Sequence, residues 1–410
     1  MAGSGRSLGD TLDEWYRTSY RTSCSLQGIA MLRFFSTLLI AVLVSLPALA
    51  DRDDDVAAFN ESWLAYKEAI ASGGSSAIIE TAGTVVDVGR KIFDDDDERL
   101  PILLTNYGRA LLAGAQPELA RDVLEEALEL SEQIHGADAK ELIVILEPLG
   151  DSVAEAHSPF RQLKHYKRAL KIVEQHFGHT STEYAAVSLR AATRSYELSQ
   201  STAGIKYLRE AREVFGVVRG EESLEAGIAE YFLAKFEFSN GRHKKVIEYA
   251  LGALPKLEGD SPELLDLQMY ARALLVQAYE QRNMSEEATP HCVAIGRISK
   301  LRPKQEHQPL FRMLPRYPAE LLMSGIEGHV DFTFTVDENG FVRDPQVITA
   351  MQTGRSPRSR SVSDFDKIDR SFEAAALEAL ERFRYAPVFV DGVATPIENV
   401  KTRVSFRIED

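Results

Sequence analysis

The segment YPAELLMSGIEGHVDFTFTVDENG, residues 317–340, stands out in a chain that otherwise reads as one helix after another. Apolar and polar residues alternate in its part VDFTFTV, which is the two-residue period of a half-buried β-strand. A turn follows at DENG, because Asn-Gly is the strongest short-range signal of a β-hairpin. Before the strand, AELLMS predicts a short helix that the following glycine ends. The segment therefore predicts the start of a small strand-forming domain.

The remaining residues complete this domain. A second strand is predicted over 341–348, followed by a flexible, locally basic loop over 350–368. Apolar residues at spacings of three and four then predict a helix over 372–383 with one apolar face. Renewed alternation predicts a last strand over 400–408. We therefore expect an α+β domain over residues 315–410, with a three-stranded antiparallel sheet and helices on one face.

The middle of the chain repeats itself. Four glycines recur at spacings of 42, 42 and 39 residues, each with an alanine nine residues before it and a large apolar residue twelve before it. This register predicts helix–turn–helix repeats, because a small residue lets two helices approach closely and a glycine ends the second helix. We expect the repeats over residues 95–300, after an acidic linker and helical cap over 51–94. The glycines are Gly136, Gly178, Gly220 and Gly259, the alanines Ala127, Ala169, Ala211 and Ala250, and the apolar residues Leu124, Tyr166, Leu208 and Ile247.

Residues 31–50, MLRFFSTLLIAVLVSLPALA, have the parts of a secretory signal peptide. An arginine gives a positive start, an apolar core follows, and the small residues Ala48 and Ala50 form a cleavage pattern. The polar residues 1–30 are then interpreted as a mis-annotated leader, with translation starting at Met31. The alternative is that the apolar core is an uncleaved membrane anchor. Both interpretations predict that the rest of the chain is exported.

The charge of the chain is unevenly distributed. The net charge is −15, and the first 299 residues hold 31 Lys/Arg and 45 Asp/Glu, against 16 and 17 in the remainder. An acidic surface of this kind repels nucleic acid. We therefore expect no nucleic-acid partner.

No set of residues in the sequence predicts catalysis or a cofactor. The two cysteines lack metal-binding spacing. His176 and His179 have no third ligand near them in the sequence, so we expect them to be exposed loop residues. The acidic runs at 51–55 and 94–98 lack the alternating ligands and central glycine of a calcium loop. We expect no enzyme, no metal and no cofactor.

The order of motifs in the last domain resembles the TonB C-terminal domain. It runs Tyr-Pro, short helix, Gly-x-x-Gly, alternating strand, Asp-x-x-Gly turn, helix, aromatic-Arg-Tyr-x-Pro, Asp-Gly and final strand. The insertion over 350–368 is longer than is usual in that family. The matching residues are Tyr317, Pro318, Gly325, Gly328, Asp337, Gly340, Phe383, Arg384, Tyr385, Pro387 and Gly392.

The repeats before this domain resemble tetratricopeptide (TPR) repeats in their longer form with an extended loop. The expected fold is therefore an all-α TPR-like helical solenoid, a linker over 301–314, and a small α+β TonB-like domain. A TPR array is a scaffold with a concave groove that binds peptides or proteins. The alternative for the repeats is that they only support the last domain.

The TonB resemblance implies a mechanism of binding. In TonB proteins this domain adds a receptor peptide as a strand to the edge of its sheet, where main-chain hydrogen bonds supply the affinity. The alternative for the apolar residues of the last strand is that they simply form the core of the domain. The accepting edge would be the last strand, with Val400, Thr402, Val404, Phe406 and Ile408.

Two functions remain open at this point. The first is a TonB-family component of transport across the envelope that contacts outer-membrane receptors. The second is a periplasmic TPR adaptor without energy coupling, because residues 34–50 lack the histidine typical of the TonB anchor and repeats replace its proline-rich spacer. The expected partners are proteins or peptides. The expected location is the periplasm, or the periplasmic side of the inner membrane if the signal is not cleaved.

Overall fold

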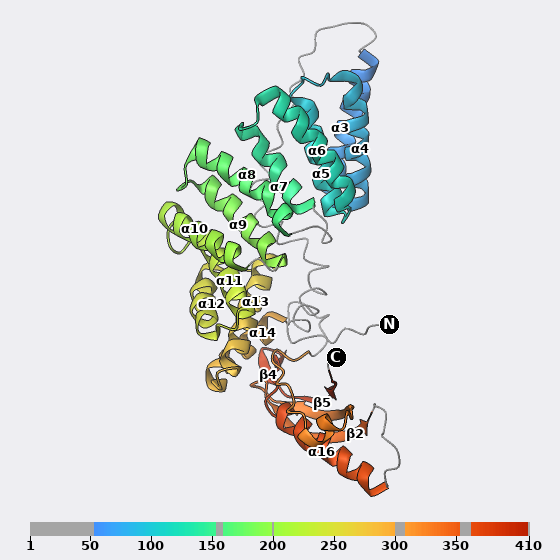
Figure 1. Cartoon of the computed structure of the whole chain (residues 1–410), viewed down its shortest axis with the longest axis vertical. Helices are drawn as coiled ribbons and strands as arrows, with labels where there is room; N and C mark the ends of the chain where they lie inside the picture. Colours follow the sequence, from blue (N-terminus) through green and yellow to red (C-terminus); the bar gives the residue numbers. More distant parts are fainter. Residues whose placement is uncertain (1–52, 153–158, 199–200, 300–307, 353–361, 409–410) are drawn as a thin grey trace. The chain divides into compact units, whose positions relative to one another are not determined.

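The structure is a computed structural model that describes five stretches of the chain (Figure 1). The predicted signal peptide over residues 31–50, with its predicted cleavage residues Ala48 and Ala50, and the predicted leader lie outside them. The described residues fall into two compact units that divide after Phe232. None of the helices in the described part is long and apolar enough to cross a lipid bilayer. The described stretches are residues 53–152, 159–198, 201–299, 308–352 and 362–408.

The first unit is built from helices that pack against their neighbours in the sequence, as α3 does on α4, α5 on α6, α7 on α8 and α9 on α10. Its elements are α3 (Asp53–Ser72), α4 (Ser75–Ile92), α5 (Arg99–Ala113), α6 (Pro117–His135), the 3₁₀-helix η1 (Lys140–Leu142), α7 (Ile143–Ser152), α8 (Pro159–Phe177), α9 (Thr182–Glu197), α10 (Ser201–Arg219) and the beginning of α11 (Leu224–Ser239).

The repeat register predicted from the sequence is confirmed. The four repeat alanines are all fully buried, at 0% exposure. Of the four large apolar positions, three are buried, whereas Ile247 is half-buried and its neighbour Val246 takes the buried place. The four repeat glycines adopt positive φ, which glycine reaches without strain. Their φ angles are 91° at Gly136, 87° at Gly178, 97° at Gly220 and 146° at Gly259. The helical part is therefore a TPR-like array of helix hairpins.

The two acidic runs lie in different kinds of structure. The run that was expected to be a linker begins α3 at Asp53, where carboxylates favour a helix N-terminus. The run at 94–98 forms the connection between α4 and α5. There Arg99 pairs with Asp97 at 2.5 Å, and this hydrogen bond lowers the pKa of the Asp97 carboxyl.

The second unit continues the helices and ends in a small sheet. Its strands pair antiparallel in the order β2-β1-β5, and β3 and β4 form a separate two-stranded sheet. Its elements after α11 are α12 (His243–Lys256), α13 (Pro262–Glu280), α14 (Ser285–Ser299), α15 (Ala319–Met323), β1 (Gly328–Val336), β2 (Val342–Gln352), α16 (Val362–Leu380), β3 (Val388–Val390), β4 (Val393–Thr395) and β5 (Ile397–Phe406). The predicted three-stranded antiparallel sheet is confirmed, and the β3–β4 hairpin was not predicted.

The core of this sheet lies between β1 and α16. Strand β1 buries every second residue, and α16 packs against all three strands of the larger sheet. Its apolar face supplies Phe372, Ala376 and Leu380, each at 0% exposure. The predicted apolar stripe of the helix is therefore confirmed.

The boundaries of three elements differ from those predicted. Strand β2 runs to Gln352 rather than 348, because Ile348 is an extra residue in the ladder and interrupts the alternation read from the sequence. Helix α16 begins at Val362, inside the predicted loop. Strand β5 ends at Phe406, so Ile408 lies beyond it, where its backbone N–H donates to Glu327 Oε1 at 2.7 Å.

Candidate protein-interaction site

The larger sheet has two edges, β2 and β5. A strand at an edge leaves half of its N–H and C=O groups without a sheet partner, so it can accept a further strand. Within the described part of the chain, β5 pairs with β1 and with no other strand. The structure thus places the predicted accepting strand at an edge of the sheet.

The two edges differ in how regular they are. Strand β2 contains Pro345, which has no N–H to donate, and Asp344 at a φ of +48°, and both are skipped in the pairing with β1. Strand β5 has no proline, and from Val400 to Phe406 it pairs residue by residue with β1. Its irregularity is confined to the start, where Asn399 has a φ of +58°. Strand β5 is therefore the better template for an added strand.

The predicted edge residues face the core. Val400, Val404 and Phe406 are 8%, 3% and 1% exposed, and Thr402 is half-buried. Their side chains therefore form the core of the domain, as the alternative interpretation expected, and the edge offers only backbone. Sequence reasoning missed the residues between them, which face outward and are exposed. These are Lys401, Arg403, Ser405 and, just after the strand, Arg407.

The motif residues Asp337 and Gly340 shape the β1–β2 turn. Asp337 Oδ1 accepts the backbone N–H groups of Asn339 and Phe341, both at 2.9 Å, and Oδ2 accepts Arg343 Nε at 2.8 Å. Gly340 has a φ of +83°, and a Cβ there would lie 2.1 Å from the carbonyl oxygen of Tyr385. Only glycine allows this approach.

The motif residues before β1 hold the start of the domain. The hydroxyl of Tyr317 donates to the carbonyl of Ile326 at 2.6 Å. The centres of the Tyr317 and Phe406 rings lie 5.5 Å apart in an edge-to-face arrangement. Pro318 precedes α15, and Gly325, at a φ of +65°, follows it. A Cβ at Gly328 would lie 2.6 Å from the Phe372 ring. These residues act in the fold rather than at the edge.

The motif residue Arg384 has a different role. Its Nη1 lies 2.5 Å from Glu280 Oε1 on α13, and the two side chains are 1% and 2% exposed. Its guanidinium also donates to the carbonyl of Ser285 at 3.2 Å and to Thr289 Oγ1 at 2.9 Å, and it lies 3.7 Å from the centre of the Phe341 ring. A buried ion pair thus joins the C-terminal module, residues 308–408, to the last helix hairpin, α13–α14.

Further contacts surround this ion pair. Phe311, at 0% exposure, pairs its backbone with that of Arg384, so the end of the predicted linker is a buried part of the module. A Cβ at Gly296 on α14 would lie 2.2 Å from the carbonyl oxygen of Pro387. One apolar cluster spans the helix hairpin and the module: Met269, Ala273, Val276, Cys292, Ile295, Leu310 and Phe311. The hairpin and the module therefore share a core.

The remaining motif residues lie around this junction and on the β3–β4 hairpin. Phe383 is 3% exposed and belongs to the core of the sheet. Gly392, at a φ of +84°, follows Asp391, at a φ of +50°, in the turn between β3 and β4. Two successive residues with positive φ are what a two-residue hairpin turn requires.

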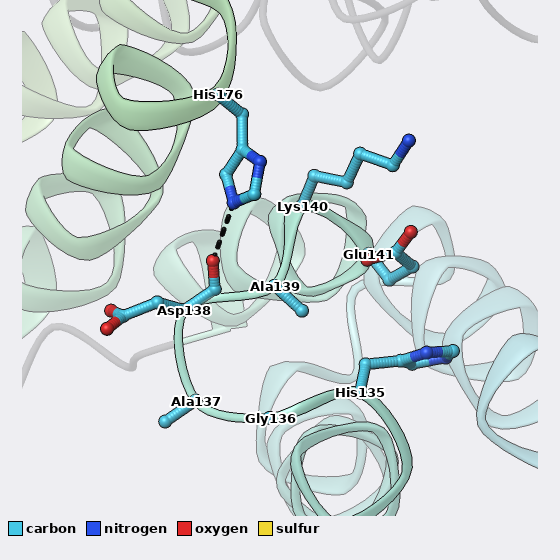
Figure 2. A pocket seen from close by; sticks show the side chains of 8 residues that line it. All are labelled: His135, Gly136, Ala137, Asp138, Ala139, Lys140, Glu141 and His176. Atoms are coloured by element: carbon cyan, nitrogen blue, oxygen red, sulfur yellow. Dashed lines mark hydrogen bonds between the residues drawn. The ribbon is translucent and has the colours of Figure 1, made fainter.

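The first unit has a polar depression on its surface. It has a volume of about 560 Å³ and is lined by residues 135–141 and His176. Figure 2 shows His176 pointing at the carbonyl of Asp138, 2.8 Å away, while His135 points away from it. Arg168 also donates to this loop, at the carbonyl of Ala137. These hydrogen bonds hold the loop after α6 against α8, so the depression is a contact between neighbouring repeats rather than a site arranged for a ligand.

Among the residues that the structure describes, no three His, Cys, Asp or Glu side chains are grouped so that they could hold a metal ion. His179 lies 4.0 Å from Glu210 and 4.2 Å from the Tyr184 ring. Cys292 is fully buried, and burial raises the pKa of its thiol to about 12. A thiol with that pKa is unreactive at neutral pH.

Comparison with known proteins finds partial likenesses. No family model matches the chain. Over 132 residues, 32% of this chain, it is 30% identical to the secreted RxLR effector protein RXLR-C07 of Plasmopara halstedii and to the RxLR effector protein SFI4 of Phytophthora infestans (strain T30-4). The match spans 40% and 38% of those two proteins, well under half of their length.

Solved structures give weak likenesses as well. A kinesin light chain from Podospora anserina with nearly identical TPR-like repeats is 14% identical, and the match covers 50% of this chain and 97% of that one, at a TM-score of 0.43. A signal-transduction ATPase with a TPR sensor from Pyrococcus horikoshii is 14% identical, with 61% and 40% covered and a TM-score of 0.44. BtubC from P. vanneervenii is 16% identical, with 62% and 94% covered and a TM-score of 0.36.

Proposed function

We propose that this chain is a non-enzymatic protein of the cell envelope whose C-terminal module binds an extended segment of a partner protein. The observation that carries the proposal is strand β5. It is a proline-free edge strand that pairs residue by residue with β1 from Val400 to Phe406 and with no other strand among the described residues. A partner segment that adds to this edge would gain main-chain hydrogen bonds without any rearrangement of the sheet.

The finer assignment is to the TonB C-terminal domain family. Its support is the order of the motif residues, together with the positions they take in turns and in the core around β1. The proposed partners are segments of outer-membrane receptors, and the proposed role is linked to transport across the envelope. The proposed location is the periplasm, on the basis of the signal-like residues 31–50.

The second candidate function is a periplasmic adaptor without energy coupling. One observation favours it: the module is joined to α13–α14 by the buried pair Arg384–Glu280 rather than by a long extended spacer. A protein that transmits force across the periplasm needs reach and an anchor. N-terminal sequencing of the protein from soluble and membrane fractions tests this, because a soluble protein beginning at Asp51 would exclude force transmission.

Strand addition itself is tested with peptides. Ten-residue peptides would be selected on the full chain from a displayed random library, and affinities measured by fluorescence anisotropy. The best peptide would then be N-methylated at one backbone nitrogen at a time. Because a strand donates only every second N–H to its neighbour, methylation at alternate positions should abolish binding and methylation at the positions between should not.

The control locates the bound peptide. A photo-crosslinker in the peptide should label residues 397–406 of the chain. Labelling of other elements, or a loss of affinity that does not alternate along the peptide, would rule out strand addition at β5.

A further inference from the structure

The outward face of β5 is basic in a chain that is acidic as a whole. The net charge of the chain is −15, yet three of the four outward-facing residues from 401 to 407 are Lys or Arg. All four side chains are exposed. These residues alternate with the buried ones, so they form one row along the free edge of the strand.

Part of this positive charge is already compensated within the sheet. Arg403 forms a bidentate salt bridge with Asp331 on β1, in which Nε donates to Oδ1 at 2.7 Å and Nη2 donates to Oδ2 at 2.9 Å. The hydrogen bond from Arg403 is also the main cause of the lowered pKa of the Asp331 carboxyl. Lys401 and Arg407, in contrast, make no ion pair with any described residue. Within the described part of the chain, two cations along the edge are therefore free to pair with a ligand.

A strand added to β5 would bring its own side chains beside these cations. Directly opposed residues on neighbouring strands have Cβ atoms about 4.5–5.5 Å apart. Residues of the added strand that face the same side as Lys401 and Arg407 recur at every second position. Lys401 and Arg407 are six residues apart, so two carboxylates six residues apart in the added strand could face both cations.

We propose that the partner segment is acidic: an extended peptide with carboxylates at alternate positions, which face Lys401, Arg407 and the compensated Arg403. This inference rests on the proposed strand addition, and it names the charge of the partner that the edge selects. An exposed cross-strand charge pair changes an equilibrium by about 1.4- to 5-fold. Two pairs should therefore give the acidic peptide about 2- to 30-fold tighter binding than a neutral one at low salt.

The test uses the full chain and three ten-residue peptides. All three share alternating Val residues, and the positions between are Glu, Gln or Lys. Affinity is measured by fluorescence anisotropy at about 20 mM and 300 mM salt. We expect the order Glu, Gln, Lys from tightest to weakest, with differences that shrink at high salt because the charges are exposed.

Charge reversal makes the test specific. In the variant K401E/R407E the preference should reverse, so that the Lys peptide binds more tightly than the Glu peptide. R370E is the matched control, because Arg370 is an exposed residue of α16 in the same module. That variant should keep the wild-type order of affinities.

The outcomes separate the two proposals. Equal affinity of the three peptides, with the alternating N-methylation pattern intact, would overturn the acidic partner and leave strand addition standing. Binding of none of the three peptides, or of any selected peptide, would overturn both. Binding of vesicles of anionic phosphatidylglycerol that depends on Lys401 and Arg407, without preference among peptides, would assign this face to a membrane surface and overturn the inference.

Discussion

Replacement of Arg384 by Met tests whether the C-terminal module is held by its buried ion pair. The substitution removes the guanidinium while keeping an unbranched apolar side chain in its place. Glu280 would then be a carboxylate at 2% exposure with no cation beside it. Removal of one partner of a buried ion pair costs about 3–5 kcal/mol, because the remaining charge is desolvated and unpaired.

That cost falls on the junction between the module and α13–α14. A loss of about 3–5 kcal/mol raises the population of the opened junction by roughly 150- to 5,000-fold at 25 °C. Amide exchange in α14 and β1 that proceeds through this opening should accelerate in proportion. The repeats from α5 to α9 belong to the other compact unit, so their exchange should stay as in the wild type.

Hydrogen exchange of the full chain, read by mass spectrometry, measures both effects at once. Arg382→Met is the matched control, since Arg382 also reaches this junction, with Nη2 at 2.7 Å from Asn283 Oδ1 and 3.1 Å from the carbonyl oxygen of Glu280, but its side chain is only half-buried and makes no ion pair with Glu280. That variant should change exchange by less than about fivefold. The double variant Glu280→Leu/Arg384→Met should recover much of the loss, because no buried charge remains.

The refuting result is specific. If Arg384→Met leaves exchange in α14 and β1 within about threefold of the wild type, the ion pair does not hold the junction. Equal effects of Arg384→Met and Arg382→Met would likewise show that burial of the pair has no special weight.

Three further predictions concern the fold. Gly340→Ala should lower the free energy of unfolding in urea by more than about 2 kcal/mol, because its Cβ would lie 2.1 Å from the carbonyl oxygen of Tyr385. Gly392→Ala, at a similar φ but in open space, should lower it by about 1 kcal/mol. Burial raises the pKa of Tyr385 to about 12, so the neutral side chain contributes up to about 2.7 kcal/mol to the free energy of unfolding below pH 10, and this contribution is lost as the pH rises to 12. In Tyr385→Phe, stability measured by urea midpoints should therefore fall less steeply over pH 10–12. Ala169→Leu, at 0% exposure, should lower stability by about 1–3 kcal/mol through overpacking, and the exposed Lys171→Leu by less than about 0.5 kcal/mol in the same thermal melts.

Local patterns predicted the parts of the fold that local chemistry determines. The alternation in β1 and the Asn-Gly turn act over a few residues, and both were found where they were expected. The repeat glycines act in the same way, since each needs a positive φ at the end of a helix. The position of Ile348 was not predictable, because an extra residue in a ladder depends on the partner strand and not on the sequence around it.

The candidate site was predicted unevenly for the same reason. The order of the motifs predicted which strand lies at the edge, but the apolar residues predicted to form that edge face the core. The signal for the outward residues was present in the alternation of KTRVSFR, residues 401–407. By contrast, no local signal joins Arg384 to Glu280, because the two residues are 104 positions apart in the chain.

The junction and the accepting edge use different ends of the sheet, so they should act independently. Arg384 meets the turn after β1, where its Nη2 donates to the carbonyl of Asn339 at 3.1 Å. The regular ladder of β5 instead extends toward the start of β1, where Phe406 pairs with Gly328 and Val404 with Val330. A partner strand on that part of the ladder gains its hydrogen bonds away from the turn that Arg384 contacts. Arg384→Met should therefore loosen the junction yet leave the affinity for the Glu peptide within about threefold of the wild type. A loss of affinity beyond about tenfold would show that the edge depends on the contact between the module and α13–α14.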